Sequence, residues 1–185
     1  MPHPIPPRIH ARGFTAIELM VVVAIMAILT ALAAPSFTPI IERWRVRQAV
    51  EGLQSTLYYA RSEAIKRGGN VIIQKNTNDA TCTASGGADS WDCGWHVWVD
   101  ANGDGTFQSS ELLQRFNTPA KVQVTRSSSQ ASIKLNRWGL TTGPFVGFSL
   151  VPQSKGVSDP AARGVCMSSG GRIRVIPPDE IPCKG

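Results

Sequence analysis

The stretch Arg12-Gly13-Phe14-Thr15-Ala16-Ile17-Glu18-Leu19 joins a basic, proline-rich leader to an apolar segment that continues to Ala34. Phe14 to Ala34 is 21 residues, which as a helix would extend roughly 31 Å, enough to cross a bilayer core of about 30 Å. Glu18 is the only charged residue of this segment. A carboxylate is costly in lipid, so an intramembrane carboxylate usually has a partner and a function. The stretch therefore predicts a membrane helix that carries one functional acidic group.

The charges around the apolar segment predict its orientation. Arg8 and Arg12 precede it, and no Lys or Arg lies within it. The positive-inside rule therefore keeps residues 1–12 in the cytoplasm and sends the C-terminal bulk across the membrane. The run Ala33-Ala34-Pro35-Ser36 has the small residues of a secretory cleavage site, but a proline just after the cut disfavours cleavage. A cleaved secretory signal and an ordinary membrane anchor stay as alternatives.

A second helical stretch is expected after Pro39. Apolar residues recur there at alternating steps of four and three, which places them on one face of a helix. These residues are Val46, Val50, Leu53, Leu57, Ala60 and Ala64. Gly68-Gly69 is typical of a helix end. We therefore expect an N-terminal helix over residues 14–67, whose second half lies against a sheet and not in lipid.

Beyond Asn70 the pattern changes to short alternating runs with turn residues between them, which is typical of strands. The expected strands are Val71–Lys75, Gly94–Val99, Leu112–Phe116, Val122–Arg126, Ser132–Leu135, Phe145–Val151, Gly164–Met167 and Arg172–Ile176. Residues 68–185 are therefore expected to form an antiparallel β head with a basic C-terminal tail. The fold class predicted is α+β, with a long N-terminal helix packed on an antiparallel sheet.

All four cysteines lie beyond the apolar segment, which fits an oxidising compartment. Four cysteines allow three pairings. Cys82 with Cys93 and Cys166 with Cys183 are favoured, because each pair closes a local loop rich in Gly, Ser or Pro. In the chain-entropy account each bond would contribute roughly 3 kcal/mol. Free thiols or a zinc site stay as alternatives, although no CxxC spacing is present.

Gly13-Phe14-Thr15-x-x-Glu18-Leu19 resembles the prepilin cleavage motif of type IV pilins and type II secretion pseudopilins. The resemblance implies that a prepilin peptidase cleaves after Gly13, removing residues 1–13, and that Phe14 is N-methylated. It also implies that Glu18 meets the free amine of a neighbouring subunit, because two charges that are each costly in lipid are relieved when subunits stack in register. Pro35 matches the helix-kinking proline of pilins.

The head extends the resemblance. Four segments follow in the order seen in the FimT/GspH family of minor pilins and pseudopilins: Trp95–Asp100, Glu111–Leu113, Asn136–Gly139 and Gly171–Arg174. This family includes type II secretion pseudopilins of the H class, FimU-like minor pilins that prime pilus assembly, and FimT-like minor pilins that bind DNA in natural transformation. It implies a type IV pilin-like fold and other pilin subunits as partners. It also implies that the chain first crosses the inner membrane once, with its head in the periplasm. The subunit is then expected to assemble at or near the tip of a pilus, at the cell surface, or into a pseudopilus.

Gly171-Arg172-Ile173-Arg174 resembles the GRxR motif of FimT proteins. On an extended strand Arg172 and Arg174 point to one side, about 7 Å apart, a spacing that suits successive phosphates of a nucleic acid. Gly170-Gly171 would let the backbone approach a ligand, and Lys184 would add charge. Such contacts carry no base information, so the DNA binding implied is independent of sequence and sensitive to salt. The structural alternative is an edge strand whose charges prevent aggregation.

Asp100-x-Asn102-x-Asp104-Gly105, followed by Glu111, matches the calcium-loop pattern of EF-hands. The sequence on either side predicts strands and not helices, and Asn-Gly and Asp-Gly are also strong hairpin-turn signals. A plain β-turn is the favoured interpretation, with a Ca²⁺ site formed by Asp100, Asn102, Asp104 and Glu111 as the alternative. No other cofactor is expected.

An enzyme is not expected. His96 lies in an alternating strand with no evident catalytic partner, and the sequence contains no nucleophile elbow, Walker A motif or GxGxxG motif. The formal net charge of +6 suits an acidic partner such as nucleic acid. Four tryptophans offer faces for base stacking, although at least two of them are expected in the core: Trp91, Trp95, Trp98 and Trp138.

Overall fold

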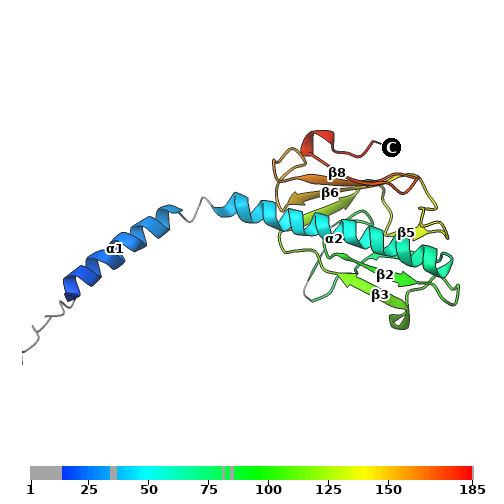
Figure 1. Ribbon diagram of the computed structural model, residues 1–185, viewed down its shortest axis with the longest axis horizontal. Coiled ribbons are helices and arrows are strands. Elements are labelled where there is room, and N and C mark those ends of the chain that lie inside the picture. The colour runs from blue at the N-terminus through cyan, green and yellow to red at the C-terminus, as the bar shows by residue number, and fades with distance from the viewer. Residues whose placement is uncertain (1–13, 34–36, 81, 84–85, 185) are drawn as a thin grey trace, which may run out of the picture. The chain divides into compact units, whose positions relative to one another are not determined.

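The computed structural model describes residues 14–33, 37–80, 82–83 and 86–184 (Figure 1). The predicted leader, with its cleavage residue Gly13, and the expected helix-kinking Pro35 lie outside the described residues. Contacts divide the chain into two compact units, Met1–Thr38 and Pro39–Gly185.

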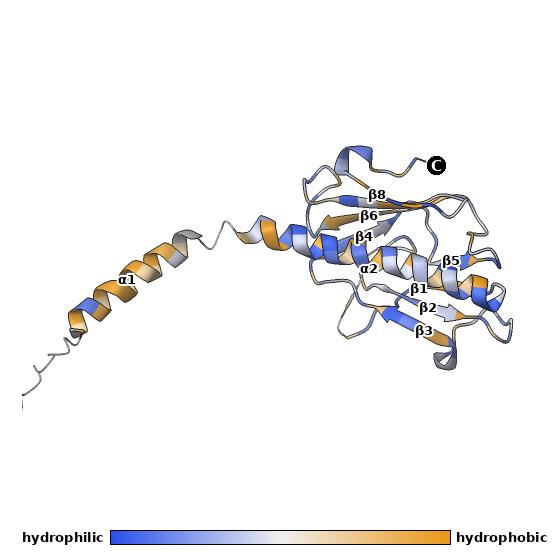
Figure 2. Ribbon diagram, in the orientation of Figure 1, coloured by the Kyte–Doolittle hydropathy of each residue, from blue (hydrophilic) through white to orange (hydrophobic). Residues whose placement is uncertain are grey.

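The first unit contains α1, Ala16–Ala33, which is apolar apart from Glu18 and Thr30 (Figure 2). Glu18 Oε2 accepts hydrogen bonds from the backbone N–H and the hydroxyl of Thr15, both at 2.9 Å, and the Glu18 N–H donates to Thr15 Oγ1 at 3.3 Å. This capping box satisfies N–H groups that a helix leaves open at its start. In the described part of the chain, no helix is both long enough and apolar enough to cross a membrane. The span expected over residues 14–34 stays a prediction.

The second unit begins in α2, Thr38–Arg67. All six residues of the predicted apolar stripe are buried, which confirms the face that sequence periodicity indicated. The helix ends where the glycine pair was expected to end it. Gly68 has φ +78°, and the Gly69 N–H donates to the Ala64 carbonyl at 2.8 Å, which closes the last turn as a Schellman motif. Glycine is favoured at position 68 because other residues rarely adopt positive φ.

The described residues of the head contain two four-stranded antiparallel sheets. Sheet A has the order β3-β2-β1-β5, with β1 Val71–Lys75, β2 Trp95–Val99, β3 Leu112–Phe116 and β5 Ser132–Leu135. Sheet B has the order β4-β6-β7-β8, with β4 Val122–Arg126, β6 Val146–Pro152, β7 Arg163–Met167 and β8 Ile173–Ile176. Two 3₁₀ turns accompany them: η2 Ser109–Glu111 and η3 Pro178–Glu180. All eight predicted strands are confirmed, with no end moved by more than one residue; their division into two sheets was not predicted.

One core joins α2 to both sheets. In Figure 1, α2 crosses the view between β6 and β8 above and β2 and β3 below. Trp95 of β2 donates its indole N–H to the Thr56 hydroxyl of α2 at 2.9 Å, and its ring stacks on Phe116 with centroids 4.7 Å apart. A Cβ on Gly52 would lie 2.2 Å from the Phe116 ring. The bare backbone at Gly52 therefore lets α2 lie directly on sheet A.

Candidate functional site

The GRxR segment leads into β8, the last strand of sheet B: Gly171 and Arg172 precede the strand, and Ile173 and Arg174 begin it. Arg172 and Arg174 are exposed, whereas Ile173 between them packs against the core. Arg174 is paired with Cys166 of β7. Since paired residues project from the same face of a sheet, Arg174 shares the outer face of sheet B with the Cys166–Cys183 disulfide. Both arginines are thus exposed to solvent at the start of an edge strand, and that they point to the same side stays a prediction.

Both predicted disulfides are confirmed: Cys82–Cys93 and Cys166–Cys183. The second one fastens the C-terminal segment onto sheet B. Gly147 of β6 is paired with Cys166, and a Cβ there would lie 2.9 Å from Cys183 Sγ, so this glycine makes room for the segment. Lys184 follows the disulfide and is exposed. Lys184 is therefore adjacent in sequence to Cys183, whose disulfide lies on the same face of sheet B as Arg174.

Gly171 has a different role from the one expected. It is buried with φ +81°, its carbonyl oxygen accepts a hydrogen bond from Arg61 Nη1 at 2.5 Å, and a Cβ would lie 2.7 Å from Arg61 Nη2. The absence of a side chain at this position makes room for the Arg61 guanidinium of α2. Gly171 therefore has a local structural role, and its assignment to DNA binding stays a prediction.

Arg61 also holds a second turn. Its Nε donates to the Gly139 carbonyl at 3.1 Å. That turn carries Trp138, whose side chain is 70% exposed, and the neighbouring Arg137 is exposed as well. Of the head's four tryptophans, Trp91, Trp95 and Trp98 are buried. Trp138 is the exposed one of these four, and Arg61 brings its turn next to the turn that precedes Arg172.

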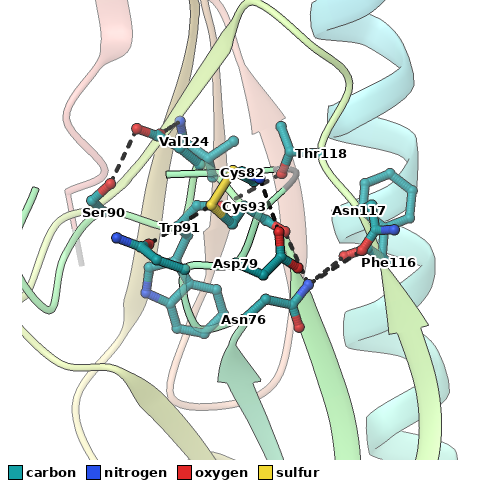
Figure 3. The surroundings of a disulfide bond; sticks show 12 residues. Asn76, Asp79, Cys82, Ser90, Trp91, Cys93, Phe116, Asn117, Thr118 and Val124 are labelled. Atoms are coloured by element: carbon teal, nitrogen blue, oxygen red, sulfur yellow. Dashed lines mark hydrogen bonds between the residues drawn. A yellow bond between two sulfur atoms is a disulfide. The ribbon is translucent and has the colours of Figure 1, made fainter. Parts of the chain in front are cut away.

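The Cys82–Cys93 disulfide closes a polar cavity of about 270 Å³ beside sheet A. Figure 3 shows Asn76 directed toward Phe116 and Asn117; its amide donates to the carbonyls of Cys93 at 2.9 Å and Phe116 at 3.2 Å. Asp79 lies beside the disulfide and accepts the Cys82 N–H at 2.9 Å (Figure 3). These bonds hold the loop that follows β1 across the end of the sheet.

His96 borders the same cavity and is 4% exposed. Its Nδ1 lies 2.9 Å from the Asn76 side-chain oxygen, while its Nε2 is buried without a hydrogen-bond partner. Burial, with a smaller contribution from the charge of Arg115, lowers the pKa of His96 to about 4. The imidazole is therefore neutral at pH 7. That the chain is not an enzyme stays a prediction.

The loop with the calcium pattern connects β2 to η2. The carboxylates of Asp100 and Glu111 are buried, whereas Asn102 and Asp104 are exposed. Within the described residues, no group of three or more His, Cys, Asp or Glu side chains is arranged as a metal centre. The flanks are a strand and a 3₁₀ turn, not the two helices of an EF-hand. The turn interpretation fits the backbone, and the calcium alternative stays a prediction.

At the N-terminal site, Phe14 is 90% exposed. Glu18 is also exposed and bonds to Thr15. Glu18 thus has a local role besides the intermolecular one expected of it, and the capping-box pattern Thr15-x-x-Glu18 is the signal that indicates it.

Two family comparisons match the chain. Residues 49–171 match the family described as type II transport protein GspH, and residues 8–34 match the prokaryotic N-terminal methylation motif. A fimbrial protein of Dichelobacter nodosus is 33% identical over 138 residues, covering 71% of this chain and 76% of that protein. A fimbrial protein of Pseudomonas aeruginosa is 31% identical over 123 residues, covering 66% of this chain and 73% of that protein.

Two solved structures share the fold. The type IV minor pilin FimU of Pseudomonas aeruginosa superimposes with a TM-score of 0.58 at 23% identity, covering 74% of this chain and 92% of FimU. The minor pseudopilin EpsH of the type 2 secretion system of Vibrio cholerae superimposes with a TM-score of 0.51 at 12% identity, covering 72% of this chain and 98% of EpsH. With an N-terminal methylation motif, a helix packed on antiparallel sheets and a GspH match over most of the head, the chain belongs to the GspH family of type IV minor pilins and pseudopilins.

Proposed function

We propose that this chain is a minor subunit of a type IV pilus, located at or near the tip, that binds DNA without sequence preference for uptake in natural transformation. The observation that carries the proposal is the exposed pair Arg172 and Arg174 at the start of the edge strand β8, with Lys184 next to the disulfide that borders Arg174.

The exposed positive charges of Arg172, Arg174 and Lys184 support a polyanion as the ligand. Guanidinium groups make bidentate, charge-assisted hydrogen bonds to phosphate oxygens. The Cys166–Cys183 bond fixes the C-terminal segment, so little conformational entropy is lost when a ligand binds. Asp179 and Glu180 of η3 are exposed nearby in sequence and oppose this attraction. We therefore expect weak binding by one subunit, strengthened when several subunits engage one strand.

Trp138 adds an aromatic surface to the arginine pair. Its turn and the turn before Arg172 are both bonded to Arg61. Proteins that bind single strands combine basic grooves with exposed aromatic rings on which bases stack. The proximity of the two turns therefore favours a single strand over a duplex as the ligand.

The N-terminal segment supports a life cycle that begins in the inner membrane. We propose that prepilin peptidase removes residues 1–13, that Phe14 is methylated, and that Glu18 pairs with the amine of a neighbouring subunit. In that assembly Glu18 would exchange one of its bonds to Thr15 for the ionic partner. The head would lie in the periplasm before incorporation and at the surface of the filament afterwards.

The second candidate is a structural role without a DNA ligand. The match to type II transport protein GspH and the fold shared with FimU and EpsH favour an H-class pseudopilin or an assembly-priming minor pilin. In that case the arginines of β8 protect an exposed sheet edge from pairing with other strands. Deletion would then abolish secretion or piliation, and the purified protein would not retain DNA.

DNA binding by the purified full chain in detergent micelles separates the two candidates. Binding of a fluorescent oligonucleotide would be followed by anisotropy across a salt series, for the unaltered protein and for Arg172→Ala/Arg174→Ala. Arg115→Ala/Lys134→Ala is the matched control, because it removes two exposed cations from sheet A. We expect the β8 variant to lose binding, with a log–log salt slope smaller by roughly 2, and the control to keep it.

Absence of binding at low salt by well-folded protein would contradict the DNA proposal and favour the structural role. Equal loss in both double variants would show that general positive charge, and not the β8 pair, attracts the DNA.

A further inference from the structure

The loop from Asp100 to Glu111 encloses two buried carboxylates. Asp100 is 4% exposed and Glu111 is 6% exposed. The loop contains a third acid, Asp104, and no Lys, Arg or His. In the described structure neither buried carboxylate forms an ion pair with a basic side chain. A buried charge without a counter-charge is strongly unfavourable, so the loop is short of positive charge.

Backbone N–H groups orient both carboxylates toward the inside of the loop. The Gly105 N–H donates to Asp100 Oδ2 at 3.2 Å. Glu111 Oε1 accepts the Ala101 N–H at 3.0 Å, and its Oε2 accepts the Gln108 N–H at 3.3 Å. Three backbone N–H groups, of Ala101, Gly105 and Gln108, thus donate to the two buried carboxylates. The bond from Ala101 brings Glu111, at the end of the loop, close to its start.

One oxygen of this pair has no partner. Asp100 Oδ1 is buried and accepts no hydrogen bond, although Oδ2 of the same carboxylate is bonded. Buried polar atoms are nearly always hydrogen-bonded, and an exception calls for a missing ion or water. An anionic oxygen that faces an acidic, cation-poor loop is the arrangement that a hard metal ion would complete.

We propose that this loop binds Ca²⁺, with Asp100 Oδ1 as its anchoring ligand. Calcium takes six to eight oxygen ligands in a flexible geometry, and Asn102, Asp104 and Glu111 provide further side-chain oxygens from the same twelve-residue loop. Asp104 Oδ1 now accepts the Thr106 N–H at 2.7 Å, and its Oδ2 accepts two amide N–H groups, so it turns inward when the ion binds. Magnesium fits less well, because it demands near-ideal octahedral geometry.

The ion would stabilise more than the loop itself. Phe107, at the middle of the loop, packs on the His96 ring with centroids 4.6 Å apart and on the Trp98 ring at 5.8 Å. Both rings belong to the outer face of β2. A bound ion therefore fixes the loop whose Phe107 packs on this face of sheet A. The calcium site is distant in sequence from Arg172 and Arg174.

Thermal unfolding of the full chain in detergent micelles, followed by circular dichroism, tests the proposal. After treatment with EDTA, the protein would be titrated with CaCl₂ and, separately, with MgCl₂. We expect Tm to rise with calcium concentration and level off, with an apparent Kd of about 0.1–1 mM, the range of extracellular calcium modules. Magnesium should produce a much smaller shift at equal concentration.

Three variants make the test specific. Asp100→Asn keeps an acceptor for the Gly105 N–H but removes the negative charge, so we expect at least tenfold weaker calcium affinity. Because the substitution also removes a buried charge, we expect its Tm in EDTA to be no lower than that of the unaltered protein. Asp104→Asn alters an exposed residue and therefore keeps the fold, and we expect it to weaken affinity too. Glu51→Gln, an exposed acid on α2, is the matched control and should respond like the unaltered protein.

Terbium provides a second readout that does not depend on stability. Tb³⁺ occupies calcium sites and emits when a nearby tryptophan transfers excitation energy to it, so Trp98 should sensitise it and Ca²⁺ should displace it. A Tm that does not respond to calcium, or an equal response in Asp100→Asn, Asp104→Asn and Glu51→Gln, would overturn the proposal and leave the loop as a plain turn.

Discussion

Arg61 of α2 donates a hydrogen bond at 2.5 Å to the carbonyl oxygen of Gly171, 110 residues further along the chain. The same guanidinium bonds to Gly139 at 3.1 Å. One partly buried side chain therefore fastens two turns, one leading to Arg172 and the other carrying Trp138, to the central helix. The position of the proposed DNA surface depends on this contact.

Replacing Arg61 should loosen both turns. We expect Arg61→Met, which keeps much of the aliphatic length, to lower the free energy of unfolding by about 1–3 kcal/mol, because two carbonyl oxygens lose a charged donor. Urea unfolding measures this loss, and Arg47→Met, an exposed arginine on the same helix, is the control. A loss below about 0.5 kcal/mol in Arg61→Met would show that the contact does not hold the turns.

Adding a methyl group at Gly52 should be destabilising even though alanine is the better helix former. The gain in helix propensity is about 1 kcal/mol, but the new Cβ would lie 2.2 Å from the Phe116 ring, which stacks on Trp95. Overpacking of this kind costs about 1–3 kcal/mol, so we expect Gly52→Ala to lower the Tm.

Gly143→Ala is the matched control for Gly52→Ala, because nothing lies within 4 Å of a Cβ at Gly143. A higher Tm for Gly52→Ala than for the unaltered protein would mean that Phe116 moves aside without cost.

His96 should make the head less stable in mild acid. Its pKa in the folded protein is lowered to about 4, chiefly by burial, whereas the pKa of His in an unfolded chain is about 6.5. Between these values the unfolded chain binds the extra proton, so stability is fully present above about pH 6.5 and falls as the pH is lowered toward 4. We expect this term to reach about 1–3 kcal/mol near pH 4.5.

The measurement is the free energy of unfolding at a series of pH values, for the unaltered protein and for His96→Asn. The variant should show a smaller decline between pH 6.5 and 4.5. Parallel curves for the two proteins would mean that His96 does not account for the decline.

Trp138 should matter for single strands more than for duplexes if the proposed function is correct. Stacking of a base on an aromatic side chain contributes about 1–3 kcal/mol, so we expect Trp138→Ala to weaken binding of a single-stranded oligonucleotide about fivefold or more. Binding of a duplex, whose bases are already stacked, should change little. Trp44→Ala, which alters an exposed tryptophan of α2, is the control, and equal losses for both oligonucleotides would argue against stacking.

Local patterns in the sequence predict most of the architecture. The stripe from Val46 to Ala64 forms the buried face of α2, because helical periodicity is a property of neighbouring residues. The two disulfides follow the same logic, since each joins cysteines only 11 or 17 positions apart. The exposed alternation of Arg172 and Arg174 around Ile173 could likewise be predicted from strand geometry.

Contacts between distant residues could not be predicted in this way. Gly171 resembles a glycine that exposes backbone to a ligand, yet it is buried because Arg61 approaches it from another element. The grouping of strands into two sheets depends on which strands meet through the common core. The unpartnered oxygen of Asp100 also depends on how the loop closes, and no sequence pattern reports a missing hydrogen bond.

The sequence by itself determined the elements of this protein and the buried face of α2, and it favoured the observed pairing of the cysteines, because these follow from local periodicity and short loops. Only the tertiary structure decided which turns meet at Arg61, which of the head's four tryptophans stays exposed and which carboxylates of the Asp100–Glu111 loop are buried without a counter-ion. These properties arise from packing between segments that are far apart in the chain. In such contacts the environment of a residue depends on its spatial neighbours, which a local sequence pattern does not reveal.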